Sequence, residues 1–300
     1  MVISPLRLQG SIFSVLALLV SIFSMLLVPM EPHHEWLLAS GLIVLLGVPH
    51  GALDPLFAQA LPQLNSRTSW FVFVACYLLL AALVVVLWWQ SPLVFLIAFL
   101  AVSILHFSGD LLAGATFLER LVYGGLIIVL PALVHAAELT RLFSQLVGLS
   151  AAVTVVAVLE LIAWPWLLAL LLVVVLRGRR DGLLALEMMA VGLLALTATP
   201  LLGFAIYFCA MHSPRHILRT QQYADVTPMR LVLVAVLPML ATLLLGGLAW
   251  HFLPASATDE RMLKLLFVAL AALTFPHMLL VERVRFSGWR KRALPASMPT

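Results

Sequence analysis

Long apolar segments with short polar breaks between them are the feature that most restricts how this chain can fold. A helix that crosses a lipid bilayer needs about 20 mostly apolar residues. Ten segments come close to that length: 8–28, 35–57, 70–89, 93–113, 118–138, 151–176, 182–198, 200–218, 230–252 and 262–284. The pattern predicts an all-α fold, a polytopic membrane bundle of about ten transmembrane helices that forms one domain over residues 1–300.

The composition excludes several other classes of protein. Apolar residues make up 64% of the chain and charged residues 10%, whereas a soluble domain carries about 25% charged residues. This excludes a soluble enzyme and a disordered chain. The net charge of +4 does not indicate a nucleic-acid partner, because the bases lie between apolar segments. Cys76 and Cys209 lie within apolar segments, so we expect small buried side chains and no disulfide.

The distribution of bases predicts the orientation of the helices. With the N-terminus inside and ten crossings, fourteen of the seventeen Lys and Arg residues fall on the inner side. Cytoplasmic loops of membrane proteins carry such an excess of bases. We therefore expect a multi-pass protein of the inner (plasma) membrane with both termini in the cytoplasm. The weakest boundary lies at Pro200, between segments 182–198 and 200–218, because fusing them would move eight bases to the other side.

Four of the nine histidines fall at outer segment ends or in the first outer loop, and the other five lie deeper within the apolar segments: His50, His106, His212, His216 and His277. In the ten-helix arrangement the segments that carry them all run from outside to inside. A rise of 1.5 Å per residue places four of them roughly 18–23 Å from the outer helix ends, and His216 lies one turn deeper. Ionisable side chains within spans are costly and typically mark a site. The common depth predicts one site in the inner third of the bilayer.

Two of these histidines are followed four residues later by an aspartate. Asp54 follows His50, and Asp110 follows His106. Residues four apart share one face of a helix. A metal-bound imidazole commonly donates its other N–H to a carboxylate. We therefore expect each aspartate to support the histidine of its own segment.

The remaining histidine spacings also favour a metal site. His212 and His216 are four residues apart, so one helix presents both rings on one face. Prolines at 49, 214 and 276 adjoin histidines and predict bends, which are tolerated at membrane depth around a buried site or cavity. Neutral imidazole suits iron, copper, zinc or nickel. The alternative is a histidine-based transporter or proton-conducting protein, which the scarcity of polar residues along the helices disfavours.

Four segments around the histidines carry recognisable motifs. Residues 47–54 read GVPHGALD, 104–110 read ILHFSGD, 211–216 read MHSPRH and 274–278 read TFPHM. These segments resemble the histidine motifs of the Brp/Blh family of integral-membrane β-carotene 15,15′-dioxygenases. The first and third are the specific ones, and together the four cover most of the chain.

The resemblance implies an enzyme that cleaves β-carotene with O₂ at its central 15,15′ double bond to give two molecules of retinal, with Fe(II) as cofactor. The iron ligands and catalytic residues of the family map onto His50, His106, His212 and His216. Asp54 and Asp110 are expected to support these ligands. The role of His277 stays open between an additional ligand and a polar contact.

The implied substrate is a rigid hydrocarbon about as long as the bilayer is thick, so we expect a tunnel entered from lipid. Aromatic residues near the histidines are candidates to line it, with ordinary packing as the alternative: Phe107, Tyr123, Tyr207 and Phe208. The implied partners are β-carotene, O₂ and the lipid bilayer, with a functional link to a retinal-binding rhodopsin.

Overall fold

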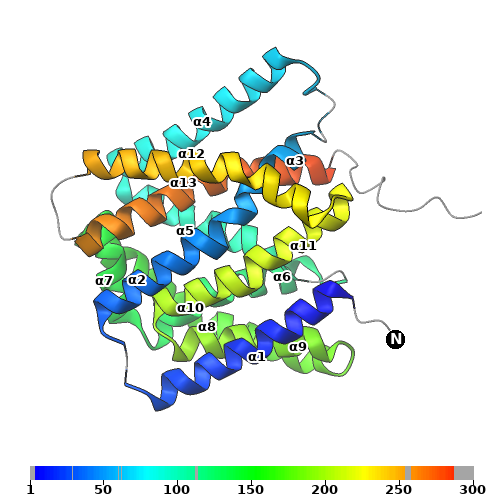
Figure 1. The fold of residues 1–300 in the computed structure, drawn as a ribbon. Helices are drawn as coiled ribbons and strands as arrows, with labels where there is room; N and C mark the ends of the chain where they lie inside the picture. Colours follow the sequence, from blue (N-terminus) through cyan, green and yellow to red (C-terminus); the bar gives the residue numbers. More distant parts are fainter. Residues whose placement is uncertain are drawn as a thin grey trace, which may run out of the picture.

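The computed structural model of the chain describes residues 4–28, 30–59, 61, 63–111, 114–253 and 258–286, and every regular element in them is helical (Figure 1). The first half contains α1 (Pro5–Leu26), α2 (Pro32–Leu42), η1 (Ile43–Gly47), η2 (Val48–Leu53), α3 (Asp54–Gln59), α4 (Arg67–Gln90), α5 (Pro92–Ser108), α6 (Phe117–Val129), η3 (Leu130–Leu133) and α7 (Ala136–Val147). The second half contains α8 (Leu149–Gly178), α9 (Gly182–Thr197), α10 (Pro200–Tyr207), η4 (Phe208–His212), α11 (Ser213–Ala224), α12 (Pro228–Phe252) and α13 (Thr258–Phe286). The all-α prediction is confirmed.

Each of the ten predicted segments coincides with a helix or a broken helix. Segment 35–57 spans four elements, from α2 to α3, and segment 200–218 spans α10, η4 and α11. The boundary at Pro200 is real, because Ala198 adopts an extended conformation after α9 and a new helix begins at Pro200. Helix α7 falls in a stretch that the sequence pattern left as a loop, and it bends by 107° from the helix before it.

The length and the apolar composition of the helices are those of a membrane protein. Among the described residues, six helices are long and apolar enough to cross a bilayer, or seven if the bent pair 117–147 is one span. Helices α5 and α9 are apolar but shorter, at 17 and 16 residues. Helix α4 has no buried residue and α12 only Leu231, so both present apolar side chains to their surroundings. That is the pattern of helices in contact with lipid.

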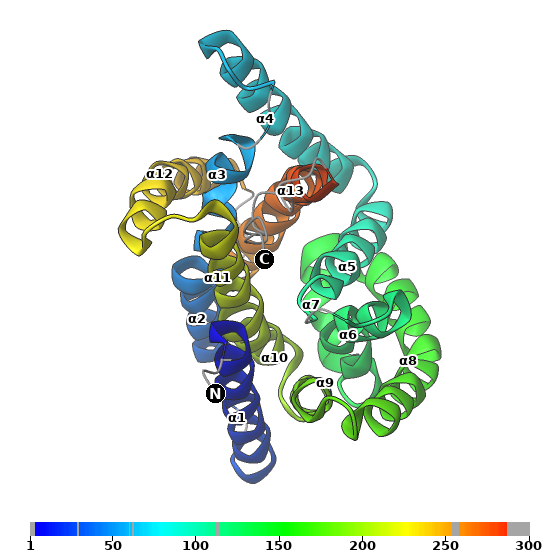
Figure 2. The ribbon, with the colours of Figure 1, turned by 90° about the vertical axis from the view of Figure 1, so that its right-hand side faces the viewer.

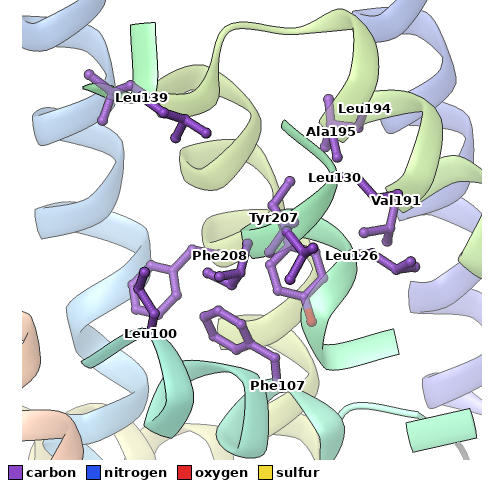
Figure 3. Packing of buried hydrophobic residues seen from close by; sticks show 14 of the residues in the cluster. Leu100, Phe107, Leu126, Leu130, Leu139, Val191, Leu194, Ala195, Tyr207 and Phe208 are labelled. Carbon is purple, nitrogen blue, oxygen red and sulfur yellow. The ribbon is translucent and has the colours of Figure 1, made fainter. Parts of the chain in front are cut away.

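Helix α13 lies between two halves of the bundle (Figure 2). On one side are α2, α10 and α11, and on the other are α5, α6 and α7. Helix α1 packs along α9, and α7 packs against α8. The main hydrophobic core is formed around α5, α6, α8, α9 and α10 (Figure 3). This arrangement brings helices that are distant in the sequence into contact with α13.

Polar side chains cap the start of α6 and join it to α8. Thr116 and Glu119 form a capping box at α6, where the Glu119 carboxylate accepts from the Thr116 backbone N–H at 2.7 Å and the Thr116 hydroxyl accepts from the Glu119 N–H at 3.3 Å. Such a box satisfies backbone donors that have no partner within the helix. Arg177 at the end of α8 donates to the same carboxylate at 2.5 and 2.7 Å and thereby joins α6 to α8.

Three of the fourteen bases that the sequence assigned to the inner side lie outside the described residues. They are Arg290, Lys291 and Arg292.

Candidate metal centre

The structure brings together the five histidines that the sequence predicts to form one site: His50, His106, His212, His216 and His277. Their rings come from η2, α5, η4, α11 and α13. The ring centroids of His106 and His212 are 4.5 Å apart, those of His50 and His212 are 4.8 Å apart, and those of His216 and His277 are 5.0 Å apart. His50, His212 and His277 are buried. Five imidazoles from five elements therefore face one small volume.

Irregular helix turns carry two of these histidines. A π-helical turn, η1, is followed by the 3₁₀ helix η2, which contains Pro49 and His50. A second π-helical turn, η4, ends at His212 just before Pro214. Proline lacks an N–H and clashes with the preceding turn, so the backbone leaves the regular α pattern there. The predicted breaks at these two prolines are confirmed, whereas α13 continues through Pro276 as one helix.

Asp110 supports a histidine of another helix, and the expected pairing with His106 is wrong. Its carboxylate accepts from His212 Nδ1 at 2.9 Å and from the Tyr207 hydroxyl at 2.8 Å. Helix α5 ends at Ser108, so Asp110 lies in the turn that follows and no longer shares a face with His106. Arg219 donates to the backbone carbonyls of residues 109–111 at 2.5 to 3.3 Å and fixes this turn.

Asp54 likewise supports a distant histidine, and its expected pairing with His50 is wrong. The Asp54 carboxylate accepts from His277 Nδ1 at 2.5 Å and from the Tyr77 hydroxyl at 2.7 Å. His50 Nδ1 instead donates to the Gly47 carbonyl at 2.6 Å. The reason is that His50 stands on a 3₁₀ turn while Asp54 begins a new α-helix, so four residues do not place them on one face.

The remaining ring nitrogens are available to a ligand. The Nε2 atoms of His212, His216 and His277 are buried and have no hydrogen-bond partner among the described residues. One ligand atom each from His50, His106 and His277 lie within 4.8 Å of one another. Buried polar atoms are normally paired, and neutral imidazoles of fixed tautomer are good ligands for first-row transition metals. The residues present therefore fit a metal ion.

A buried ion pair between Arg215 and Glu187 lies next to the histidine cluster. The Arg215 guanidinium donates to both carboxylate oxygens of Glu187 at 2.9 Å, to the Asp110 backbone carbonyl at 3.0 Å and to the Gln9 side-chain oxygen at 2.9 Å. Gln9 in turn donates to the Ala210 carbonyl at 2.8 Å, within η4. Arg215 is one of the fourteen bases that the sequence assigned to the inner side. It is fully buried within the protein as part of α11, so it is not a base of a cytoplasmic loop.

Two hollows adjoin α5 and α13. The first, here called the polar cavity, has a volume of about 520 Å³. It is bordered by His106, His212 and His216 and by six charged residues: Arg7, Asp110, Arg120, Asp181, Arg219 and Glu282. The second, here called the apolar groove, has a volume of about 220 Å³. It lies between α4, α5 and α13 and is bordered among others by Leu83, Phe95, Phe99, Val102, Ala271 and Phe275.

Comparison with known proteins gives the family. The model of a family described as β-carotene 15,15′-dioxygenase matches residues 41–284, which include all five histidines. The chain belongs to the β-carotene 15,15′-dioxygenase family. It is 31% identical over 253 residues to the β-carotene 15,15′-dioxygenase of an uncultured marine bacterium, which covers 81% of this chain and 92% of that protein.

A second relative comes from an archaeon. The chain is 28% identical over 281 residues to the probable β-carotene 15,15′-dioxygenase Blh of Halobacterium salinarum, which covers 79% of this chain and 81% of that protein. No solved structure matches the chain.

The aromatic residues expected to line a tunnel belong to the main hydrophobic core. Figure 3 shows three of them, Phe107, Tyr207 and Phe208. Phe107 and Phe208 pack on His212, with ring centroids 4.9 and 5.5 Å away. Tyr123 and Tyr207 are fully buried. None of the four borders the polar cavity or the apolar groove. Their role as tunnel residues in this dioxygenase-family chain stays a prediction.

The sequence did not identify the residues that position Asp54 and Asp110, the two aspartates that accept hydrogen bonds from the histidines. Glu187 carried a usable signal, since it is the single acid of segment 182–198 and charge inside a span usually marks a site. Arg215 stood in the MHSPRH motif but was read as a surface base. Tyr77 lies in the middle of α4 and Gln9 near the start of α1. Neither carried a signal, because a single uncharged polar residue in an apolar helix is common in any membrane protein.

Proposed function

We propose that this chain cleaves β-carotene at its central double bond with O₂ and releases two molecules of retinal. The observation that carries the proposal is the cluster of five histidines inside the region that the family model matches. The reaction balances without an external reductant, because the double bond is broken and each of its carbons takes one oxygen atom of O₂ as an aldehyde.

Fe(II) is the metal that we assign to the centre, and its ligands are His50, His106, His212 and His216. When bound, Fe(II) supplies the activation of O₂. The chain holds the imidazoles ready for it. The Gly47 carbonyl accepts from His50 Nδ1 and the Asp110 carboxylate accepts from His212 Nδ1, so Nε2 of each ring remains free for the metal.

The two hollows support a substrate position along α5 and α13. On α5, the residues that border the apolar groove precede His106, and residues 109–111 at the polar cavity follow it. On α13, residues 271 and 275 precede His277, and residues 278–284 follow it. The stretch of α5 from residue 95 to its end at residue 108 is about 20 Å long, which is about two thirds of the hydrocarbon core of about 30 Å. A long hydrocarbon lying along both helices would present its middle to the histidines.

The membrane setting completes the proposal. We assign the chain to the inner (plasma) membrane as a single catalytic domain with ten crossings and both termini in the cytoplasm. β-Carotene dissolves in lipid, so the bilayer is its source, and retinal released there is available to a retinal-binding rhodopsin. The apolar outer faces of α4 and α12 are consistent with a lipid environment.

The decisive experiment is product analysis with labelled oxygen. The full chain, purified in detergent with Fe(II), is incubated with β-carotene under ¹⁸O₂. We expect two retinals for each β-carotene consumed, with ¹⁸O in the aldehydes. A folded, iron-loaded protein that yields no retinal, or that cleaves β-carotene elsewhere in the polyene, would disprove the proposed reaction. In a carotenoid-producing host the same activity appears as loss of orange colour and accumulation of retinal.

A further inference from the structure

Two relays of the same composition meet at the metal centre. In the first, the Tyr207 hydroxyl donates to Asp110 Oδ2 at 2.8 Å, and His212 Nδ1 donates to the same carboxylate at 2.9 Å. His212 is buried, and its Nε2 atom has no partner among the described residues. The relay thus fixes the ring and leaves one nitrogen facing the cluster.

The second relay repeats this arrangement on other helices. The Tyr77 hydroxyl of α4 donates to Asp54 Oδ2 at 2.7 Å, and His277 Nδ1 of α13 donates to Asp54 Oδ1 at 2.5 Å. His277 is buried, and its Nε2 atom also lacks a partner among the described residues. His277 therefore has the same arrangement as His212, in which Nδ1 donates to an aspartate and Nε2 is left without a partner among the described residues.

The position of His277 is that of a member of the cluster. Its ring centroid is 5.4 Å from His50, 5.3 Å from His106 and 5.0 Å from His216. His277 also contributes one of the three ligand atoms that lie within 4.8 Å of one another, together with His50 and His106. His277 therefore lies as close to the other imidazoles as they lie to one another, and its Nε2 atom is buried without a partner among the described residues.

We propose that His277 is itself a ligand of the metal, a fifth imidazole in addition to His50, His106, His212 and His216. Asp54 and Tyr77 are positioning residues that hold its tautomer and raise its basicity. This inference rests on the metal site of the proposed function, and it concerns which residues form that site. Asp54 then has the same task for His277 that Asp110 has for His212.

The test measures the metal directly in the full chain purified in detergent. Fe(II) affinity is determined by competition with a chelator, and the visible absorption spectrum is recorded with Co(II) as a probe ion. His277→Ala is compared with His212→Ala as a reference ligand and with His34→Ala as a control, since the His34 side chain is 71% exposed. His277→Gln, which keeps a polar side chain, serves if the alanine variant does not fold.

We expect His277→Ala and His277→Gln to lower Fe(II) affinity and to change the Co(II) spectrum, while His34→Ala changes neither. Asp54→Asn and Tyr77→Phe should weaken Fe(II) binding by about 10- to 100-fold, as loss of a partner behind a ligand does. Added imidazole should partly restore the Co(II) spectrum of His277→Ala, because it can occupy the vacated position.

The inference is overturned if the His277 variants bind Fe(II) as tightly as wild type and keep its Co(II) spectrum while His212→Ala loses both. His277 would then be a polar contact that affects turnover alone. This failure is separate from failure of the proposed function, which is read from retinal formation by the wild-type chain. If wild type binds neither ion, the inference and the proposed metal site fall together.

Discussion

The guanidinium of Arg215 and the carboxylate of Glu187 form a two-pronged ion pair in which neither side chain is exposed to solvent. Glu187 belongs to α9, and Arg215 stands between His212 and His216 in α11. The same guanidinium holds the backbone carbonyl of Asp110 at 3.0 Å. A pair buried in this way fixes where α9, α11 and the turn after α5 meet, because either charge without the other is poorly tolerated away from water.

Removal of one charge of this pair is therefore expected to be costly. Glu187→Ala should lower the free energy of unfolding by about 3–5 kcal/mol, measured by chemical denaturation in detergent. The control is Arg7→Ala, since the Arg7–Asp181 pair spans 3.8 Å with Arg7 56% exposed and pairs of that kind contribute about 0–1 kcal/mol. The double variant Glu187→Ala, Arg215→Ala should cost less than the sum of the single changes. Equal and small losses in Glu187→Ala and Arg7→Ala would contradict a structural role for the pair.

Gly10 offers a way to disturb the pair without touching a charge. A Cβ atom at Gly10 would overlap the Glu187 carboxylate and come within 2.7 Å of Arg215 Nη2. We expect Gly10→Ala to destabilise the protein by about 1–3 kcal/mol, as overpacking does. Gly41→Ala in α2 is the matched control, because nothing lies within 4 Å of its Cβ position, and it should be neutral or stabilising by up to about 1 kcal/mol. A thermal shift that is the same for both variants would show that the contact at Gly10 is relaxed.

The partner of Asp110 can be identified by combining substitutions. Asp110→Asn should weaken Fe(II) binding by about 10- to 100-fold in the wild-type background. In a His212→Ala background it should have little further effect, because the ring that Asp110 supports is already gone. In a His106→Ala background the effect should persist. Chelator competition measures all of these affinities. If Asp110→Asn loses its effect with His106→Ala instead, Asp110 supports the histidine of its own segment.

The apolar groove can be filled without approaching the histidines. Ala98→Phe places a ring in the groove, whereas Val94→Phe adds the same ring at a position on α5 that is 53% exposed and outside the groove. If the groove holds part of the substrate, Ala98→Phe should raise KM for β-carotene about tenfold, or about 1.4 kcal/mol of binding. Fe(II) affinity should not change in either variant. Equal KM values in both variants would place the substrate elsewhere.

The sequence was sufficient for the helices other than α7 and for the histidine set. Lipid-facing segments such as 70–89 and 230–252 can be predicted from local composition. Most side chains there contact lipid and few other parts of the protein, so their apolar character is needed whatever the tertiary structure is. His212 and His216 share a face through local helix geometry. The prolines at 49 and 214 interrupt their helices through a clash within one turn. All of these effects act over a few residues, so a pattern in the sequence reports them.

The partners of the histidines were decided by tertiary structure alone. His212 and its supporting Asp110 are 102 residues apart, and His277 and Asp54 are 223 residues apart. The i, i+4 rule failed for both aspartates because their helices change form between histidine and aspartate. Arg215 looked like a surface base until the packing of α9 placed Glu187 against it. By itself the sequence determined which residues are polar within the membrane; only the folded chain decided which of them meet, since hydrogen bonds and ion pairs depend on distances between helices that no local spacing encodes.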